Sequence, residues 1–398
     1  MSEFQFYDFR SIDRPLTDSE RREVSSWSSR SNASSHRATF NYSYGDFGKK
    51  PLDCVAKYFD AMFYTANWGT RHLIFRFPKK MVDYKALAAF DIDASEATGY
   101  ETGIALSSRG EYALLEFQFC EDDYSGWIDE EDDTLSGLLS LREDILQGDY
   151  RSLFIFWLDM ANRLALDTMD EDNFDDEDED EEGRSPLKVP PIPANLKQSN
   201  PALKALIELY ELNTDLIAAA ATFSVEPPKS APFNLQTALK ELSEKEKYDW
   251  LTRLFEGEMR LDKTFKKHLE SLQSTTKAEK VTPKTIPFSD ITALLGSKKA
   301  ERLENEAIDK ANAHIKKMTE LSKNEAEMWK TVYFNLDRKT NAAYDIASDT
   351  LKDLYDVAVF IDRKKLFLEK FYDIEDRYGR SRILLERLKA RKLPVRRA

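Results

Sequence analysis

Residues that carry covalent or metal chemistry are scarce in this 398-residue chain. Its two cysteines, Cys54 and Cys120, can neither form a disulfide framework nor supply the four ligands of a structural zinc site. The sequence also has only four histidines and 13 glycines. None of these falls in an HExxH motif, a Walker loop or a Gly-x-Ser-x-Gly nucleophile elbow. We therefore expect no metal, no cofactor and no recognisable catalytic set.

Long apolar runs are missing as well. No stretch of about 18 consecutive apolar residues occurs, so we expect no membrane span and no membrane partner. The opening MSEFQFYDFRSIDR lacks the basic and apolar regions of a secretory signal. With only two cysteines in the chain, these absences lead us to expect a soluble protein in the reducing cytoplasm.

The most prominent feature that is present is an acidic block. Sixteen residues from Asp167 to Glu182 carry twelve acidic side chains and no basic one. The block thus accounts for twelve of the 14 net negative charges of the chain. Because like charges repel along the backbone and few apolar groups are present, we predict a disordered linker over residues 167–186. It would separate two differently built domains.

The N-terminal side of the block mixes strand and helix patterns. Thr17 and Glu20 form a capping box, which predicts a helix to about Ser28. Strands are predicted at residues 37–44, 71–77, 103–106 and 111–119, and helices near 51–63, 83–90, 135–146 and 149–166. We therefore predict an α+β domain over residues 1–166, with one sheet of about four strands and helices.

The C-terminal side shows helical periodicity without a convincing strand pattern. Trp329, Val332, Tyr333 and Leu336, for example, recur at the spacing of one helical face. Short connections between such segments favour antiparallel neighbours. We therefore predict an all-helical domain of stacked helical hairpins over residues 187–398, with a further boundary near the proline-marked segment 275–288.

Several stretches of the sequence resemble known families. IDRPLT (12–17), YGDF (44–47), KYFDAMFYTANWGTRHLIFRFP (57–78) and LREDILQGDYRSLFIFWL (141–158) resemble a family of uncharacterised bacterial proteins. The tail, from YDIASDTLKDL to RSRILLERLKARKL, resembles the helical C-terminal segment of bacterial SWIM zinc-finger proteins. The SWIM zinc motif, Cys-x-Cys followed by Cys-x-His, is absent. The resemblance thus implies shared companion helices, no zinc and no transferable activity, in a cellular context alongside nucleic acid.

Cationic side chains that could contact phosphate groups lie in three places. Lys49 and Lys50 follow a Gly-Asp-Phe-Gly segment, in which a strand-to-helix turn is favoured because the Walker spacing is absent. Two arginines of the predicted strand 71–77 and six cations of the basic tail complete the set: Arg71, Arg76, Arg380, Arg382, Arg391, Lys392, Arg396 and Arg397. Phosphate contacts by the tail would be salt-dependent. A solvated final helix, or a contact between the tail and the acidic block, stays open as an alternative.

Three functions remain after these exclusions. The leading hypothesis is a non-catalytic protein-interaction or adaptor protein whose helical hairpins present a surface to another protein. The alternative is a nucleic-acid-associated accessory protein that uses the basic tail. A third hypothesis is an enzyme with a pocket in the N-terminal domain near Trp68, Arg71, His72 and Arg76, at a helix-to-strand junction.

Overall fold

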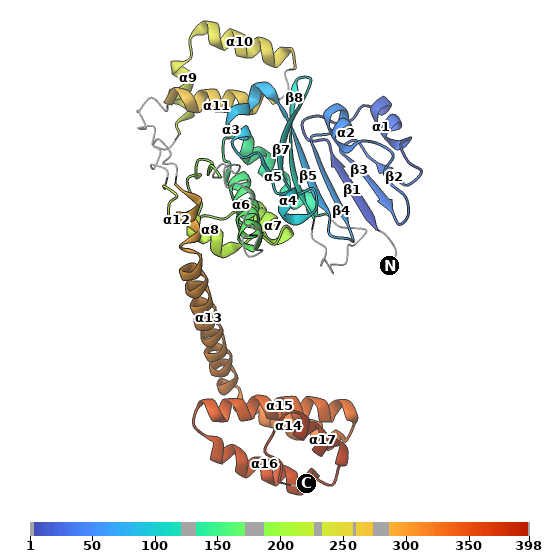
Figure 1. Cartoon of the computed structure of the whole chain (residues 1–398). Coiled ribbons are helices and arrows are strands. Elements are labelled where there is room, and N and C mark those ends of the chain that lie inside the picture. The colour runs from blue at the N-terminus through green and yellow to red at the C-terminus, as the bar shows by residue number, and fades with distance from the viewer. Residues whose placement is uncertain are drawn as a thin grey trace. The chain divides into compact units, whose positions relative to one another are not determined.

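The computed structural model describes residues 4–120, 133–171, 187–226, 233–257, 260–273 and 286–396. The chain divides into two compact units, Met1–Lys298 and Lys299–Ala398 (Figure 1). The predicted linker beyond residue 171 and the candidate contact Arg397 lie outside the described residues. None of the described helices is long and apolar enough to span a membrane.

An antiparallel sheet of eight strands forms the centre of the first unit, in the order β2-β3-β1-β4-β5-β8-β7-β6 (Figure 1). The strands are β1 (Gln5–Arg10), β2 (Ser31–Ala33), β3 (Arg37–Tyr42), β4 (Ala61–Ala66), β5 (Arg71–Pro78), β6 (Ile92–Asp93), β7 (Gly103–Arg109) and β8 (Tyr112–Phe119). The predicted sheet with helices is confirmed, and the prediction of about four strands was wrong. Strands β3, β5, β7 and β8 were predicted, whereas β1, β2, β4 and β6 were not.

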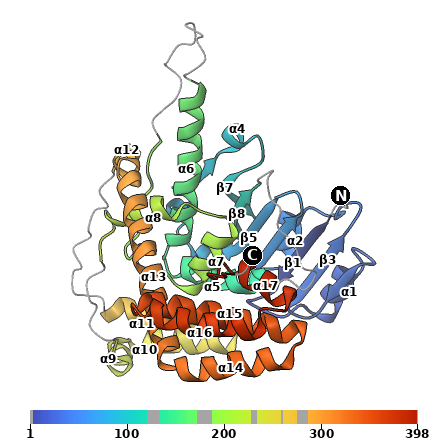
Figure 2. The ribbon, with the colours of Figure 1, turned by 90° about the horizontal axis from the view of Figure 1, so that it is seen from below.

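Helices cover both faces of this sheet. Successive side chains of a strand point to opposite faces, and apolar side chains on each face pack against helices. Helices α1 (Asp18–Ser25) and α2 (Pro51–Tyr58) pack on one face around aromatic side chains such as Phe9, Phe40 and Phe59. On the other face lie α5 (Thr134–Leu146), α6 (Arg151–Glu171), α7 (Pro201–Leu209) and α8 (Thr214–Ala221) (Figure 1, seen from below in Figure 2). The small elements η1 (Lys79–Met81), α3 (Tyr84–Ala88) and α4 (Ser95–Thr98) connect strands.

Residues after the acidic block complete the core of the first unit. The Tyr210 ring, which directly follows α7, lies 5.0 Å from Phe156 of α6 and 5.7 Å from Phe119 of β8. The predicted limits at 166 and 187 stay a prediction, and the division between the two compact units follows Lys298. The remaining helices of this unit are α9 (Leu235–Glu241), α10 (Glu244–Phe255), α11 (Leu261–Gln273), α12 (Phe288–Thr292) and the first residues of α13 (Leu295–Lys323).

Every described secondary-structure element of the second unit is a helix, which confirms the prediction of a helical C-terminal region. It holds the rest of α13, α14 (Glu325–Arg338), α15 (Asn341–Phe360), α16 (Lys364–Tyr378) and α17 (Arg382–Ala390). Val332, Leu351 and Phe371 belong to its own fully buried core. Thr340 caps α15 directly after α14 ends, so these two helices form a hairpin.

Candidate functional site

The residues of the predicted N-terminal pocket do not converge. The Arg71 guanidinium lies over the Phe119 ring and donates to the carbonyl of Leu209. His72 and Arg76 project from the opposite face of β5, because neighbouring strand positions alternate. His72 lies 3.0 Å from a Glu116 oxygen, and Arg76 donates to Asp60 at 2.8 Å. Each of these three side chains thus has partners of its own within the fold.

The first pair of candidate phosphate contacts lies in an exposed turn. Lys49 and Lys50 are exposed between β3 and α2, where Lys50 is the N-cap residue and Pro51 begins the helix. The structure thus has the strand-to-helix turn that the sequence favoured. Trp68 lies in the turn between β4 and β5 and is 40% exposed.

The cations of the basic tail are largely engaged within the second unit. Arg387 and Arg391 of α17 reach Asp345 and Asp349 of α15, each at 2.5 Å. The hydrogen bond from Arg387 lowers the pKa of Asp345. Arg396 lies over the Tyr372 ring at 3.9 Å, and the exposed Arg382 pairs with Glu386 at 2.9 Å. Among the described residues, Arg380 and Lys392 are exposed cations for which no ion pair is found.

A buried group of charges closes one end of the sheet. This sheet-end ion cluster consists of Asp13, Asp60, Arg76, Arg142, Glu143 and Arg260. Arg142, only 1% exposed, donates two hydrogen bonds to Asp13, at 3.0 and 2.8 Å. Arg260 reaches both Asp13 and Glu143 and so ties the start of α11 to the sheet.

The charges of the sheet-end ion cluster compensate one another. Burial by itself raises the pKa of Asp13, but hydrogen bonds and positive charge from Arg142 and Arg260 outweigh it and lower the pKa. Three guanidinium groups face three carboxylates, so the cluster leaves no net charge for a ligand. Its arrangement is that of a structural ion network.

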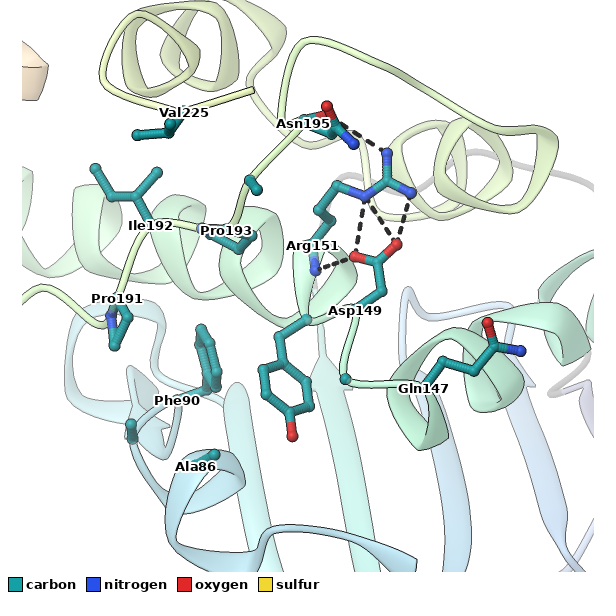
Figure 3. Close-up of a pocket in the computed structure, with 14 residues that line it drawn as sticks. Ala86, Phe90, Gln147, Asp149, Arg151, Pro191, Ile192, Pro193, Asn195 and Val225 are labelled. Atoms are coloured by element: carbon teal, nitrogen blue, oxygen red, sulfur yellow. Dashed lines mark hydrogen bonds and ion pairs between the residues drawn. The ribbon is translucent and has the colours of Figure 1, made fainter. Parts of the chain in front are cut away.

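A cavity of about 690 Å³ lies where α3, the turn between α5 and α6, and the segment 191–195 meet (Figure 3). Apolar side chains, including Phe90 and Ile192, form much of its wall. The two charged residues that line the cavity, Asp149 and Arg151, form an ion pair at 2.6 Å (Figure 3). Arg151 also donates hydrogen bonds to backbone carbonyls of the 195–198 turn. Within the described part of the chain, no group of three or more His, Cys, Asp or Glu side chains could hold a metal ion.

A second concavity, of about 580 Å³, lies between the three helices α9, α10 and α11, and we call it the α9–α11 groove. Its apolar lining consists of Leu239, Leu242, Trp250, Leu251, Leu254, Leu261 and Phe265. Four polar side chains also line it: Gln236, Lys240, Lys247 and Asp262. The floor is held by contact of the Trp250 and Phe265 rings, whose centroids are 4.8 Å apart.

Helix α10 exposes an unusual amount of apolar surface. Its N-terminus is fixed by a capping box between Ser243 and Glu246, yet none of its residues is buried. The exposed fractions are 72% for Tyr248, 62% for Leu251, 64% for Leu254 and 93% for Phe255. Helices carrying such side chains normally bury them against a neighbour. The α9–α11 groove is therefore the strongest candidate site of the molecule.

The width of the apolar face of α10 is a feature of the sequence that could have indicated this groove. Leu239, Leu242, Trp250, Leu251 and Leu254 indicate two helices with apolar faces. On α10, however, the apolar positions extend to Tyr248 and Phe255, which is wider than one contact face. Such excess width points to a surface that a single intramolecular neighbour does not cover.

No family model, no curated protein and no solved structure matches this chain. The resemblance to a bacterial family and to SWIM-associated helices therefore stays a prediction.

Proposed function

We propose that this chain is a non-catalytic protein-interaction protein and that the α9–α11 groove is its partner-binding surface. One observation carries the proposal: four large apolar side chains of α10 are more than half exposed beside an apolar concavity. Contiguous exposed apolar surface of this kind typically marks an interaction site.

The energetics of such a surface suit partner binding. Burying a leucine or phenylalanine side chain contributes about 1.5–3 kcal/mol. Three such side chains contribute about 5–9 kcal/mol, which is comparable with the cost of association, and the partner side chains that cover them add further apolar burial. Residues of this kind at the centre of an interface commonly dominate its binding energy.

The alternative role beside nucleic acid has weaker support. The tail arginines Arg387, Arg391 and Arg396 are engaged by acidic or aromatic side chains of their own unit. Contact with phosphates would have to replace these interactions. The enzyme hypothesis has less support still, because Arg71 lies on the opposite face of β5 from His72 and Arg76.

Affinity purification from the native host tests the proposed function. Three forms of the full chain are compared: wild type, Leu251→Glu with Leu254→Glu, and a matched control, Phe334→Glu with Leu366→Glu. The control residues are 65% and 57% exposed and lie in the second unit. We expect an identified, near-stoichiometric partner with the wild type and the control, and its loss with the groove variant. Equal recovery of that partner by all three forms, or recovery by none, would contradict the proposal.

A further inference from the structure

On the basis of that proposed function, we infer that the α9–α11 groove binds one amphipathic α-helix of a partner protein. The partner helix carries large apolar side chains on one face and acidic side chains at the end that lies beside Lys240 and Lys247 of the groove.

The backbone of the groove selects a helix over an extended segment. A strand binds by pairing with an open sheet edge, and the groove is built from three helices whose backbone groups are bonded internally. A partner segment that buries its backbone here must satisfy its own N–H and C=O groups. An α-helix does so and presents side chains at i, i+3, i+4 and i+7 to an apolar surface.

The length of the groove fits a short helix. Lys247 and Leu254 line it seven positions apart on α10, which corresponds to about 10 Å along the helix axis. That distance matches about two turns of a partner helix. Two or three of its large side chains can therefore contact Trp250, Leu251 and Leu254 at once.

The charges of the rim are separated along the groove. Lys240 lies in the last turn of α9 and Lys247 in the first turn of α10, so both lie near the α9–α10 turn, whereas Asp262 lies in the first turn of α11. Lys247 pairs with Glu244 of its own helix, at 2.8 Å, and such exposed pairs exchange easily. Lys240 and Lys247 are the charged side chains that line this end of the groove, so they favour acidic residues at the adjoining end of the partner, with Lys247 exchanging Glu244 for a partner carboxylate.

A peptide titration tests this inference on the full chain. The probe is a fluorescein-labelled helical peptide of about 16 residues with leucines at i, i+3, i+4 and i+7 and two glutamates at one end. A second peptide has two lysines in place of the glutamates. Binding is followed by fluorescence anisotropy for the wild type, for Lys240→Glu with Lys247→Glu, and for Leu254→Glu. Lys310→Glu with Lys316→Glu, two exposed lysines of α13, is the control for net charge.

We expect Lys240→Glu with Lys247→Glu to lower the affinity for the glutamate-flanked peptide about fivefold and to raise the affinity for the lysine-flanked one. The control variant should change either affinity little. Leu254→Glu should weaken both peptides about thirtyfold. Equal affinities for the two peptides, unchanged in the Lys240→Glu with Lys247→Glu variant, would overturn the inference. Failure of both peptides, while Leu251→Glu with Leu254→Glu still loses the native partner, would also overturn it and leave the proposed function intact. A dimer of the full chain that Leu254→Glu dissociates would assign the groove to a second copy instead.

Discussion

Arg142 illustrates how single residues hold the first unit together. Its guanidinium is almost fully buried, donates to both oxygens of Asp13 and lies 3.6 Å from Asp60. The Asp60 carboxylate also accepts hydrogen bonds from the backbone N–H groups of Ile12 and Asp13, at 2.6 and 2.8 Å. Buried charges are costly unless they are paired and hydrogen-bonded, and each member of this group is. Removing one member leaves the others uncompensated.

The first prediction concerns this residue. Arg142→Ala should lower the free energy of unfolding of the full chain by about 3–5 kcal/mol, because two buried carboxylates lose their shared cation. The matched control is Arg382→Ala, whose 91% exposed side chain pairs with Glu386, and it should change stability by less than about 1 kcal/mol. Urea denaturation measures both. An equal decrease in the free energy of unfolding of both variants would show that the buried network stabilises the chain no more than an exposed ion pair does.

At the scale of elements, local sequence determined some structures and tertiary packing determined others. The capping box at Thr17 and Glu20 correctly predicted α1, because the side chains and backbone that form it lie within four residues. Strand β3 was predicted from alternating apolar and polar residues, and its side chains are alternately buried and half-buried in the structure. Strand β4 is buried on both faces, so it lacks this alternation, and the spacing of Phe59 and Phe63 imitates a helix.

The α9–α11 groove could be predicted only in part from the sequence. Apolar periodicity indicates two of its three helices, α9 and α10, but the exposure of α10 depends on which neighbours the fold places beside it. Conversely, the opposite orientation of Arg71 and His72 follows from the strand period alone, once 71–77 is a strand. Arg71 therefore faces away from His72 and Arg76, and the pocket near these residues stays a prediction.

The second prediction concerns helix α1 and pH. A hydrogen bond from Arg14, with further bonds from Thr17, lowers the pKa of Glu20 from 4.5 to about 2. Because the pKa in the folded state is depressed, the stabilisation by Glu20 is present above about pH 4.5. It is lost as the pH falls from there towards about 2.

Glu20→Gln should therefore destabilise the chain by about 1 kcal/mol at neutral pH, and the difference from the wild type should narrow below pH 4.5. Denaturation at several pH values measures this difference, and an NMR titration of the Glu20 carboxyl group locates its pKa. A difference that stays constant down to pH 3, or an ordinary Glu20 titration, would refute the assignment.

At the scale of the whole molecule, each compact unit has its own hydrophobic core. The core of the first unit joins β4, β5 and β8 to helices on both sides of the acidic block, including Leu206 and Tyr210. The second unit buries its aromatic and aliphatic side chains among α14 to α17. We therefore expect folding of the sheet to require residues beyond 187, and folding of the second unit not to require the sheet.

The third prediction follows from this division. A fragment of residues 299–398 should unfold cooperatively by itself, and residues 1–298 should do the same. A fragment of residues 1–166 should aggregate or lack a cooperative transition, because it would expose the surface that α7 and α8 cover. Circular dichroism and thermal denaturation of the three fragments measure these outcomes. Independent folding of 1–166 would show that the helices after the acidic block are dispensable for the sheet.

The fourth prediction tests the central claim, partner binding at the α9–α11 groove, most directly. A photoreactive amino acid replaces Leu254 in one form of the full chain and Phe334, which is similarly exposed, in another. After irradiation in the native host, the groove position should give a discrete crosslink to a second protein, mapped to a helical segment with acidic flanking residues. The Phe334 position should not give that product. Absence of a specific crosslink at Leu254, or the same products at both positions, would contradict the account.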